Sequence, residues 1–475
     1  IEGTLNNLTF SNGQIKSGLI KITGDYNFID LLSNKNDFAI YANNHSISLN
    51  YNSLKGLMPK VLGKVLPKEI SNLGTIKFNG STTFTKTYLT TSSILISALG
   101  SAKINATIHH LNEEEKAEYS GDIDFENFDL GSLANTKSLG NITSKLNIKG
   151  VGFTQKSLDA KVTGEINSFV FENYNYKNIT LSGNFKHPLF DGELNIDDPN
   201  LKLTFNGLID ISEKLNRFDF KTDIEYAELN KLNLMKRDSI SVFVGKIDMN
   251  MIGNNLNNTY GSISFKETFY QTENNDFYFN DFLITSKKDG LKRVIDINSP
   301  DIMTGYISGE FLIEDIPDLF INGVGSIYAN FKPKKITKNE YINFDFEIYN
   351  KLIGIFVPQL EFGNDTRIKG SVYSNESKIK FDFESPEMIV FNNYLGKVKF
   401  KLDNFNPLYN TYISVDTLDN GFYNLKDINF INKTINDTLY VSTNFSGGKN
   451  KDYFNLSLYY TIDREGNSVV GVKKS

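Results

Sequence analysis

Cysteine and tryptophan are both absent from this chain of 475 residues, and only four histidines occur. Without cysteine there is no disulfide framework, no thiolate metal site and no thiol nucleophile. The histidines are His45, His109, His110 and His187. None of them has a second type of metal ligand nearby at the sequence spacing that metal sites use. We therefore expect the histidines to be surface residues, and we expect neither a metal nor a cofactor.

The chain also lacks an excess of one charge and a long apolar run. It has 50 Lys and Arg against 56 Asp and Glu, a net charge of -6 with the two signs interspersed. This balance provides no basic footprint for nucleic acid. The longest apolar candidate, residues 92–102, is serine-rich and shorter than the ~18 residues of a membrane helix. No serine elbow, phosphate loop or distinct carboxylate pair occurs, so we do not expect an enzyme.

What the chain does have is alternation of apolar and polar residues along most of its length. Clusters of Gly, Asn, Asp and Pro separate these stretches, as in residues 197–200 and 287–290. The pattern is typical of half-buried antiparallel strands in hairpin succession. Because such stretches recur about every 11 residues between 176 and 226, the chain has room for roughly 35 to 40 strands. The sequence predicts an all-β fold.

One segment, residues 53–72, has helical spacing instead of alternation. Lysines lie opposite its apolar positions, Ser53 is the expected N-cap and Gly74 the expected stop. Two interpretations stay open: a helix that covers a sheet edge or face, or a lid on an apolar groove. The residues of the possible lid are Leu54, Leu57, Val61, Leu62, Val65, Leu66 and Ile70.

A longer repeat overlies the strands. An apolar residue is followed four positions later by an acidic or amide residue and then by Leu, Ile or Phe, with another apolar residue three positions further on. The spacing of these copies predicts repeated modules within one continuous elongated fragment, 1–475, with module ends near 34, 133, 232, 319 and 408. The acidic or amide positions are Asp30, Asp129, Glu228, Asp315 and Asn404.

The strands between 179 and 224 place their apolar residues on one side. A sheet with one apolar side is covered by a second sheet, a barrel wall, a helix layer or a ligand. The pattern alone favours a stacked sandwich or a barrel, in which these residues are ordinary core. If the sheet is instead open, they line a groove, where Gly183 marks a place that stays wide or bends. The residues are Ile179, Leu181, Phe185, Leu194, Ile196, Leu201, Leu203, Phe205, Ile209, Phe218, Phe220 and Ile224.

Residues 171–212, "FENYNYKNITLSGNFKHPLFDGELNIDDPNLKLTFNGLIDIS", resemble the repeat of TamB proteins from Bacteroidota, relatives of the AsmA-like envelope proteins. Residues 57–80, 128–153, 293–311 and 402–409 are also similar to that family. The resemblance covers most of the chain in order. It implies a long antiparallel β-sheet curled into a taco-like groove, and it favours an open groove over a filled sandwich.

The resemblance also implies a function. Members of that family are periplasmic proteins implicated in phospholipid transfer between membranes and in outer-membrane biogenesis. They are anchored to the inner membrane of Gram-negative bacteria by an N-terminal segment and contact an outer-membrane barrel protein of the BamA/TamA class through a C-terminal region. We interpret this chain, which includes neither end, as an internal fragment that carries the acyl chains of phospholipids in its groove.

Two other functions remain as alternatives. A chaperone-like scaffold would offer its groove or an edge strand to outer-membrane β-barrel proteins during their assembly. A transmembrane barrel would show aromatic girdles at both ends of its strands. Tyr and Phe are instead spread along the strands, which disfavours the barrel.

Overall fold

The computed structural model of the chain is all-β, as the alternation predicts. It describes every residue except 19, 32–37, 58–67, 112, 114, 155, 187, 212–213, 329–330, 337–338, 350–358, 449–451 and 474–475. The described residues form 29 strands in a single antiparallel sheet that curls but does not close into a barrel. The closed barrel and the stacked sandwich favoured by pattern alone are therefore wrong. The curled sheet implied by the resemblance is confirmed.

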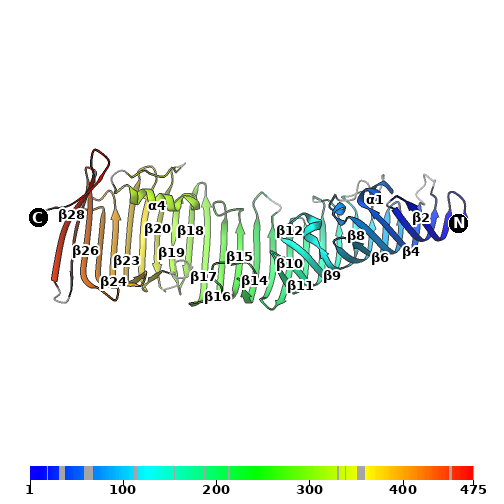
Figure 1. Cartoon of the computed structure of the whole chain (residues 1–475), viewed down its shortest axis with the longest axis horizontal. Coiled ribbons are helices and arrows are strands. Elements are labelled where there is room, and N and C mark those ends of the chain that lie inside the picture. The colour runs from blue at the N-terminus through cyan, green and yellow to red at the C-terminus, as the bar shows by residue number, and fades with distance from the viewer. Residues whose placement is uncertain are drawn as a thin grey trace. The chain divides into compact units, whose positions relative to one another are not determined.

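The chain divides into two compact units, which are described separately below. The first comprises Ile1–Lys246 with Tyr270–Asn275, and the second comprises Ile247–Phe269 with Asp276–Ser475. Figure 1 shows the strands following one another in chain order within each unit. There are fewer strands than the 35 to 40 expected, because helical segments and long connections take up part of the chain.

Most strands of the first unit are 10 to 13 residues long. Two of the strands, β15 and β16, contain residues of both units. Their bounds are β1 Glu2–Gly3, β2 Leu8–Ser17, β3 Ile20–Ile29, β4 Ala39–Asn50, β5 Thr75–Thr85, β6 Tyr88–Ser97, β7 Gly100–His109, β8 Glu118–Asp129, β9 Leu139–Val151, β10 Asp159–Phe171, β11 Tyr174–Lys186, β12 Leu189–Asp198, β13 Leu201–Asp210, β14 Arg217–Glu228, β15 Ser241–Ile252 and β16 Tyr260–Thr272.

The strands of the second unit vary more in length, from 3 to 14 residues. One short strand, β21, pairs with β23, so that β20 and β22 pair directly. The bounds are β17 Asp276–Asp289, β18 Lys292–Ser299, β19 Met303–Glu310, β20 Tyr341–Ile348, β21 Leu360–Phe362, β22 Thr366–Tyr373, β23 Lys378–Val390, β24 Asn393–Asp403, β25 Thr411–Asp419, β26 Asn424–Ile435, β27 Thr438–Gly447, β28 Asp452–Ile462 and β29 Ser468–Val472.

The expected helix at 53–72 is only partly described. Helix α1 spans Tyr51–Leu57 and the 3-10 helix η1 spans Lys68–Leu73. The N-cap is Asn50 rather than Ser53, because the Asn50 side chain accepts a hydrogen bond from the Ser53 N–H at 2.9 Å. Gly74 follows η1 with a φ of +69°, as expected of a helix stop.

Two further helices were not predicted. Helix α3, Leu130–Ala134, lies beside η1, and the Asn72 side-chain amide donates hydrogen bonds to the Ser132 and Leu133 carbonyls. In the second unit, the 3-10 helix η2, Ile313–Asp315, leads into helix α4, Ile316–Gly325. Helix α3 lies between β8 and β9 in the chain, and α4 lies between β19 and β20. In each case the two strands pair directly. The expectation of a single helix is therefore wrong.

Four of the repeated acidic or amide positions, Asp30, Asp129, Glu228 and Asn404, lie where strands end, whereas Asp315 ends η2. Asp129 accepts hydrogen bonds from the Ser132 N–H at 2.9 Å and hydroxyl at 2.6 Å, capping α3. Glu228, which is buried, accepts one from the Ser241 N–H at 3.1 Å. Asn404 accepts one from the Ile379 N–H at 3.0 Å. These side chains satisfy backbone N–H groups at the start of a helix, for Asp129, or near the start of a strand, for Glu228 and Asn404.

In the second unit, α4 covers part of the apolar face of the sheet, over β20 and β22–β24. Leu319 of α4 is 1% exposed, and the Phe320 ring lies 5.7 Å from the ring of Phe344 on β20. Figure 1 shows α4 running across several strands of this unit. This covered region is a filled core, not an open groove. Its buried members are Phe311, Leu319, Ile327, Ile342, Phe344, Val372, Ile379 and Leu402.

Candidate functional site

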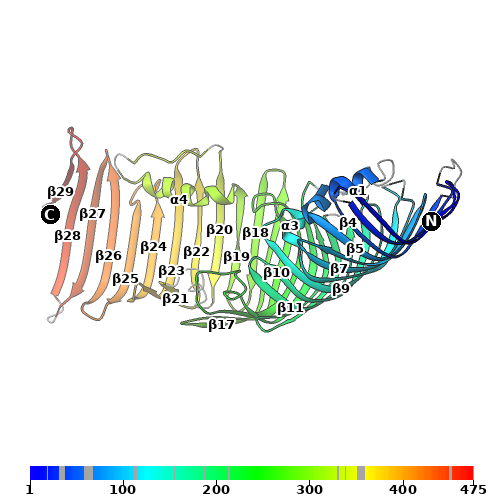
Figure 2. The same cartoon turned by 45° about the vertical axis from the view of Figure 1, so that its right-hand side comes forward.

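The twelve residues predicted to line a groove all lie on one face of β11–β14, here called the inner face. Strand register sets this arrangement, because residues directly opposite each other in an antiparallel pair point to the same side. Ile179 is opposite Ile196, which is opposite Leu203. Leu203 is in turn opposite Ile224. Figure 2 shows the strands of this unit bowed across their length.

These twelve residues differ in how far they are buried. Ile179 and Leu201 are buried and pack with Tyr176, Ala227 and Leu232. Leu232 follows the capping position Glu228 and is fully buried. The remaining ten are half-buried, which leaves part of their apolar surface accessible: Leu181, Phe185, Leu194, Ile196, Leu203, Phe205, Ile209, Phe218, Phe220 and Ile224.

A glycine row crosses the inner face beneath a series of phenylalanines. Gly183 is opposite Gly192, and Gly192 is opposite Gly207. A Cβ atom on Gly183 would lie 2.4 Å from Cε2 of Phe190, so the Phe190 ring occupies the space that a side chain would take. Gly183 therefore accommodates a ring rather than keeping the groove wide. The rings of Phe185, Phe190, Phe205 and Phe220 follow one another at centroid distances of 5.0, 6.1 and 5.1 Å.

An apolar hollow of about 610 Å³ lies beside this series, on the inner face of β7–β11. Of the predicted residues only Leu181 and Phe185 line it. The remaining lining was missed, although it lies in stretches that alternate in the same way, with Val162 opposite both Ile148 and Gly183. The other lining residues are Ile104, Ala106, Ile108, Tyr119, Ser120, Gly121, Ile123, Leu146, Ile148, Phe153, Leu158, Ala160 and Val162.

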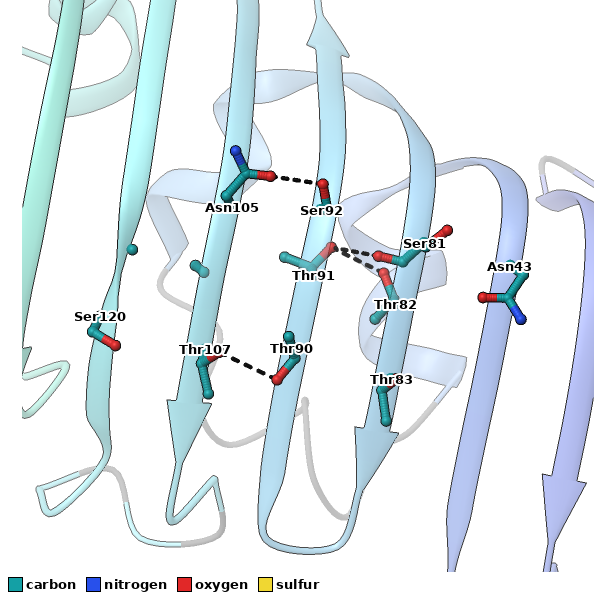
Figure 3. Close-up of a pocket in the computed structure, with 12 residues that line it drawn as sticks. Asn43, Ser81, Thr82, Thr83, Thr90, Thr91, Ser92, Asn105, Thr107 and Ser120 are labelled. Carbon is teal, nitrogen blue, oxygen red and sulfur yellow. Dashed lines mark hydrogen bonds between the residues drawn. The ribbon is translucent and has the colours of Figure 1, made fainter.

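A buried polar row adjoins the hollow on β4–β6. His45 Nε2 lies 2.8 Å from the Thr82 hydroxyl, which is 3.0 Å from the Thr91 hydroxyl. The Thr91 hydroxyl lies 2.9 Å from that of Ser93, and Figure 3 shows the contact between Thr91 and Thr82. Because Thr91 is opposite Ala106, this row is directly beside the hollow's lining. The inner face thus changes from hydroxyl-rich to apolar between β6 and β7.

The prediction that His45 is a surface residue is wrong. His45 is 2% exposed, and its ring stacks on Phe78 at a centroid distance of 5.6 Å. His109 and His110 are exposed, as expected, whereas His187 lies outside the described residues. Burial lowers the pKa of His45, and the nearby Phe78 backbone opposes that shift less strongly. The imidazole is therefore buried in its neutral form.

Acidification is expected to destabilise the first unit through His45. Because the pKa of His45 is lower in the folded chain than its usual value of about 6.5, the unfolded chain takes up the proton first as the pH falls. The contribution is complete above pH ~6.5 and is lost as the pH falls from there towards the folded pKa. Urea unfolding at several pH values should show this loss in the unsubstituted chain and a flatter profile in His45→Gln. Identical profiles for the two proteins would contradict it.

Most of the predicted lid residues lie outside the part of the chain that the structure describes. Val61, Leu62, Val65 and Leu66 lie outside the described residues, as do the side chains of Leu54 and Leu57 in α1. Ile70 lies on η1 and packs against a cluster formed by residues of η1, β5, β8 and β9. The buried members of that cluster are Leu73, Ile76, Phe128 and Ile142.

On the opposite, outer face of the first unit the side chains around β5–β7 are mainly polar. Ser92 donates a hydrogen bond to Asn105 at 2.7 Å, and the hydroxyls of Thr90 and Thr107 lie 3.2 Å apart (Figure 3). These neutral residues border a shallow hollow of about 510 Å³. The two faces therefore differ in chemistry: the continuous apolar surface is on the inner face, whereas the outer face carries only scattered apolar residues such as Ile94 and Ile96.

The described part of the chain contains neither a metal-binding cluster nor a helix that could span a membrane. Within the described part of the chain, no three His, Asp or Glu side chains come together to hold a metal ion. No described helix is both long and apolar enough to cross a membrane. Comparison of the chain with protein-family models, curated proteins and solved structures found no match. The resemblance to TamB proteins therefore stays a prediction.

Proposed function

We propose that the chain carries phospholipids by holding their acyl chains against the inner face of the first unit. The observation that supports this most directly is the apolar hollow of about 610 Å³ on β7–β11, whose lining contains no charged side chain. Tyr119 is the one inward-facing side chain of this lining that bears a hydroxyl, since the Ser120 side chain, opposite Thr107 and Lys149, points to the outer face. An uncharged, elongated apolar ligand fits such a lining best.

The dimensions of the hollow suit an acyl chain. Five adjacent strands at ~4.8 Å spacing extend roughly 19 Å across the sheet. The hydrocarbon core of a bilayer is ~30 Å thick, so the acyl chains of one leaflet span about 15 Å. Each buried methylene contributes about 0.8 kcal/mol, and this gain has no directional requirement. Aliphatic and aromatic walls thus hold the chain while allowing it to slide.

The structure of the second unit restricts where lipid would lie. Helix α4 covers the apolar face there over β20 and β22–β24, with Leu319 and Ile379 each 1% exposed. Lipid beneath α4 would have to displace a packed core. The proposal therefore places the acyl chains in the first unit, on β7–β14.

The cellular setting of this proposal rests on the family resemblance. It places the chain in the periplasm of a Gram-negative bacterium, between an inner-membrane anchor and an outer-membrane barrel partner of the BamA/TamA class. There the groove would take part in phospholipid transfer and outer-membrane biogenesis. The alternative, a scaffold for assembling barrel proteins, uses the same face for a polypeptide instead of a lipid.

Native mass spectrometry of the purified chain tests the proposal. We expect bound phospholipid, released as the protein is activated in the gas phase. A photo-crosslinking amino acid at Ile123, within the hollow, should capture lipid in cells, whereas the same group at Asp122, on the outer face, should not. Barrel-protein adducts at Ile123 would favour the scaffold instead. A lipid-free protein without adducts at Ile123 would overturn both functions.

A further inference from the structure

Two lysines lie directly opposite each other on the outer face of the first unit. Lys149 on β9 pairs in register with Lys161 on β10. Side chains in such a position have Cβ atoms about 4.5–5.5 Å apart, and like charges there destabilise the strand pair. Both side chains are exposed, and neither ammonium group has an ion-pair partner among the described residues.

Neighbouring charges on the same face are arranged differently. Lys145 on β9 is opposite Asp124 on one side and Glu165 on the other. Lys186 on β11 forms an ion pair with Asp159 at 2.9 Å. At these two positions a lysine is therefore next to an acid, whereas Lys149 and Lys161 are opposite each other with no acid between them. The next positions in the Lys149–Lys161 row are Ser120 and Asn184, which carry no charge.

The lysine pair lies in a hollow of about 410 Å³, distinct from the apolar one. Ser120, Asn184 and His109 supply further hydrogen-bonding groups to its lining. Two carboxylates also line it, but Asp159 is already paired with Lys186. Glu118 is then the only unpaired acid among the described lining residues, against two unpaired lysines.

We propose that this outer-face hollow binds a phosphate group, held between the ammonium groups of Lys149 and Lys161. A phosphate removes the repulsion between the two lysines and accepts charge-assisted hydrogen bonds from both. Ser120 and Asn184, on either side in the same row, supply neutral donors. Glu118 limits the excess positive charge, which suits a single phosphate better than a polyanion. The site does not depend on the proposed acyl-chain hollow.

Phosphorus-31 NMR titration of the full chain with inorganic phosphate tests this site. We expect saturable binding that weakens at least tenfold in Lys149→Gln/Lys161→Gln. The matched control is Lys16→Gln/Lys21→Gln, which removes two lysines from another directly opposed pair, on β2 and β3. Neither Lys16 nor Lys21 lines the hollow, so the control should bind phosphate like the unsubstituted chain. Equal weakening in both variants, or no saturable binding at all, would overturn the proposal.

The source of the phosphate is distinguished by a parallel experiment with vesicles. If the ligand is a lipid headgroup, the unsubstituted chain and the control variant sediment with phosphatidylethanolamine vesicles, whereas Lys149→Gln/Lys161→Gln does not. If the ligand is a soluble phosphate, none of the three proteins sediments with the vesicles, although the unsubstituted chain and the control variant still bind inorganic phosphate. If the acyl-chain function proposed above fails, the phosphate titration and the vesicle experiment keep the same expected results. Leu181 and the other residues of the apolar hollow lie on the inner face, away from this site.

Discussion

Arginine in place of Leu181 is expected to empty the chain of phospholipid. Leu181 lines the apolar hollow and lies opposite Gly164 on one side and Leu194 on the other. A guanidinium group at this position has no carboxylate opposite it, and an acyl chain cannot cover it without burying an unpaired charge. If the arginine displaces even four methylene groups, roughly 3 kcal/mol of binding is lost at about 0.8 kcal/mol each, more than a hundredfold in affinity.

Ser182→Arg is the matched control for this experiment. Ser182 is the next residue on the same strand but points to the outer face, opposite Thr163 and Glu193. It carries the same added charge at the same place in the sheet without entering the hollow. Quantifying lipid phosphorus in the purified proteins should show loss in Leu181→Arg alone. Equal lipid in both variants, each with an unchanged circular dichroism spectrum, would place any bound lipid elsewhere.

The alternation in the sequence was sufficient to predict which side chains share a face. A period of two assigns every second residue to one side, and a slip by one residue would have moved all of them. Ile179, Ile196 and Leu203 accordingly lie side by side across β11–β13. Alternation does not reveal what covers the apolar side, since a sandwich, a barrel and an open groove share the same pattern. This is why the pattern alone favoured a closed fold.

His45 shows where counting alternate residues fails. A register shift occurs between Ala42 and His45 in the pairing of β4 with β5, and Asn44 has a φ of 46°. This β-bulge adds one residue, so Ala42 and His45 both face inwards although they are three positions apart. Regular alternation would have placed His45 on the outer face. A single asparagine in a left-handed conformation is a weak signal in a sequence rich in asparagine.

The short helices could not be predicted from periodicity for a different reason. Helix α3 has 5 residues and α4 has 10, so neither completes enough turns to show an amphipathic pattern clearly. The repeated acidic or amide position was visible, yet its meaning was not. In the folded chain Asp129 accepts a hydrogen bond from an N–H group at the start of α3, and Glu228 accepts one from the N–H group of Ser241 at the start of β15. The repeat thus marks where the chain leaves the sheet to cover its edge, information that depends on tertiary contacts.

Truncation of Leu319 to alanine is expected to destabilise the second unit by about 2–5 kcal/mol, since it leaves a cavity in a packed core. Leu319 is 1% exposed and belongs to the cluster that joins α4 to β20, β22, β23 and β24. Ile321→Ala is the control, because Ile321 lies on the same helix but is 42% exposed and should cost less than about 1 kcal/mol.

Hydrogen exchange measured by mass spectrometry locates the effect of Leu319→Ala. The amides of α4, β20 and β22 should exchange faster, because the cluster couples the helix to these strands and a weaker contact lets them open more often. Peptides from β7–β11, in the first unit, should exchange as before, since none of their residues contributes to the cluster. Faster exchange confined to α4 would show that the helix rests on a sheet that is stable without it. Faster exchange in the underlying strands would instead show that α4 is part of the core. The strands beneath α4 would then depend on the helix for their stability.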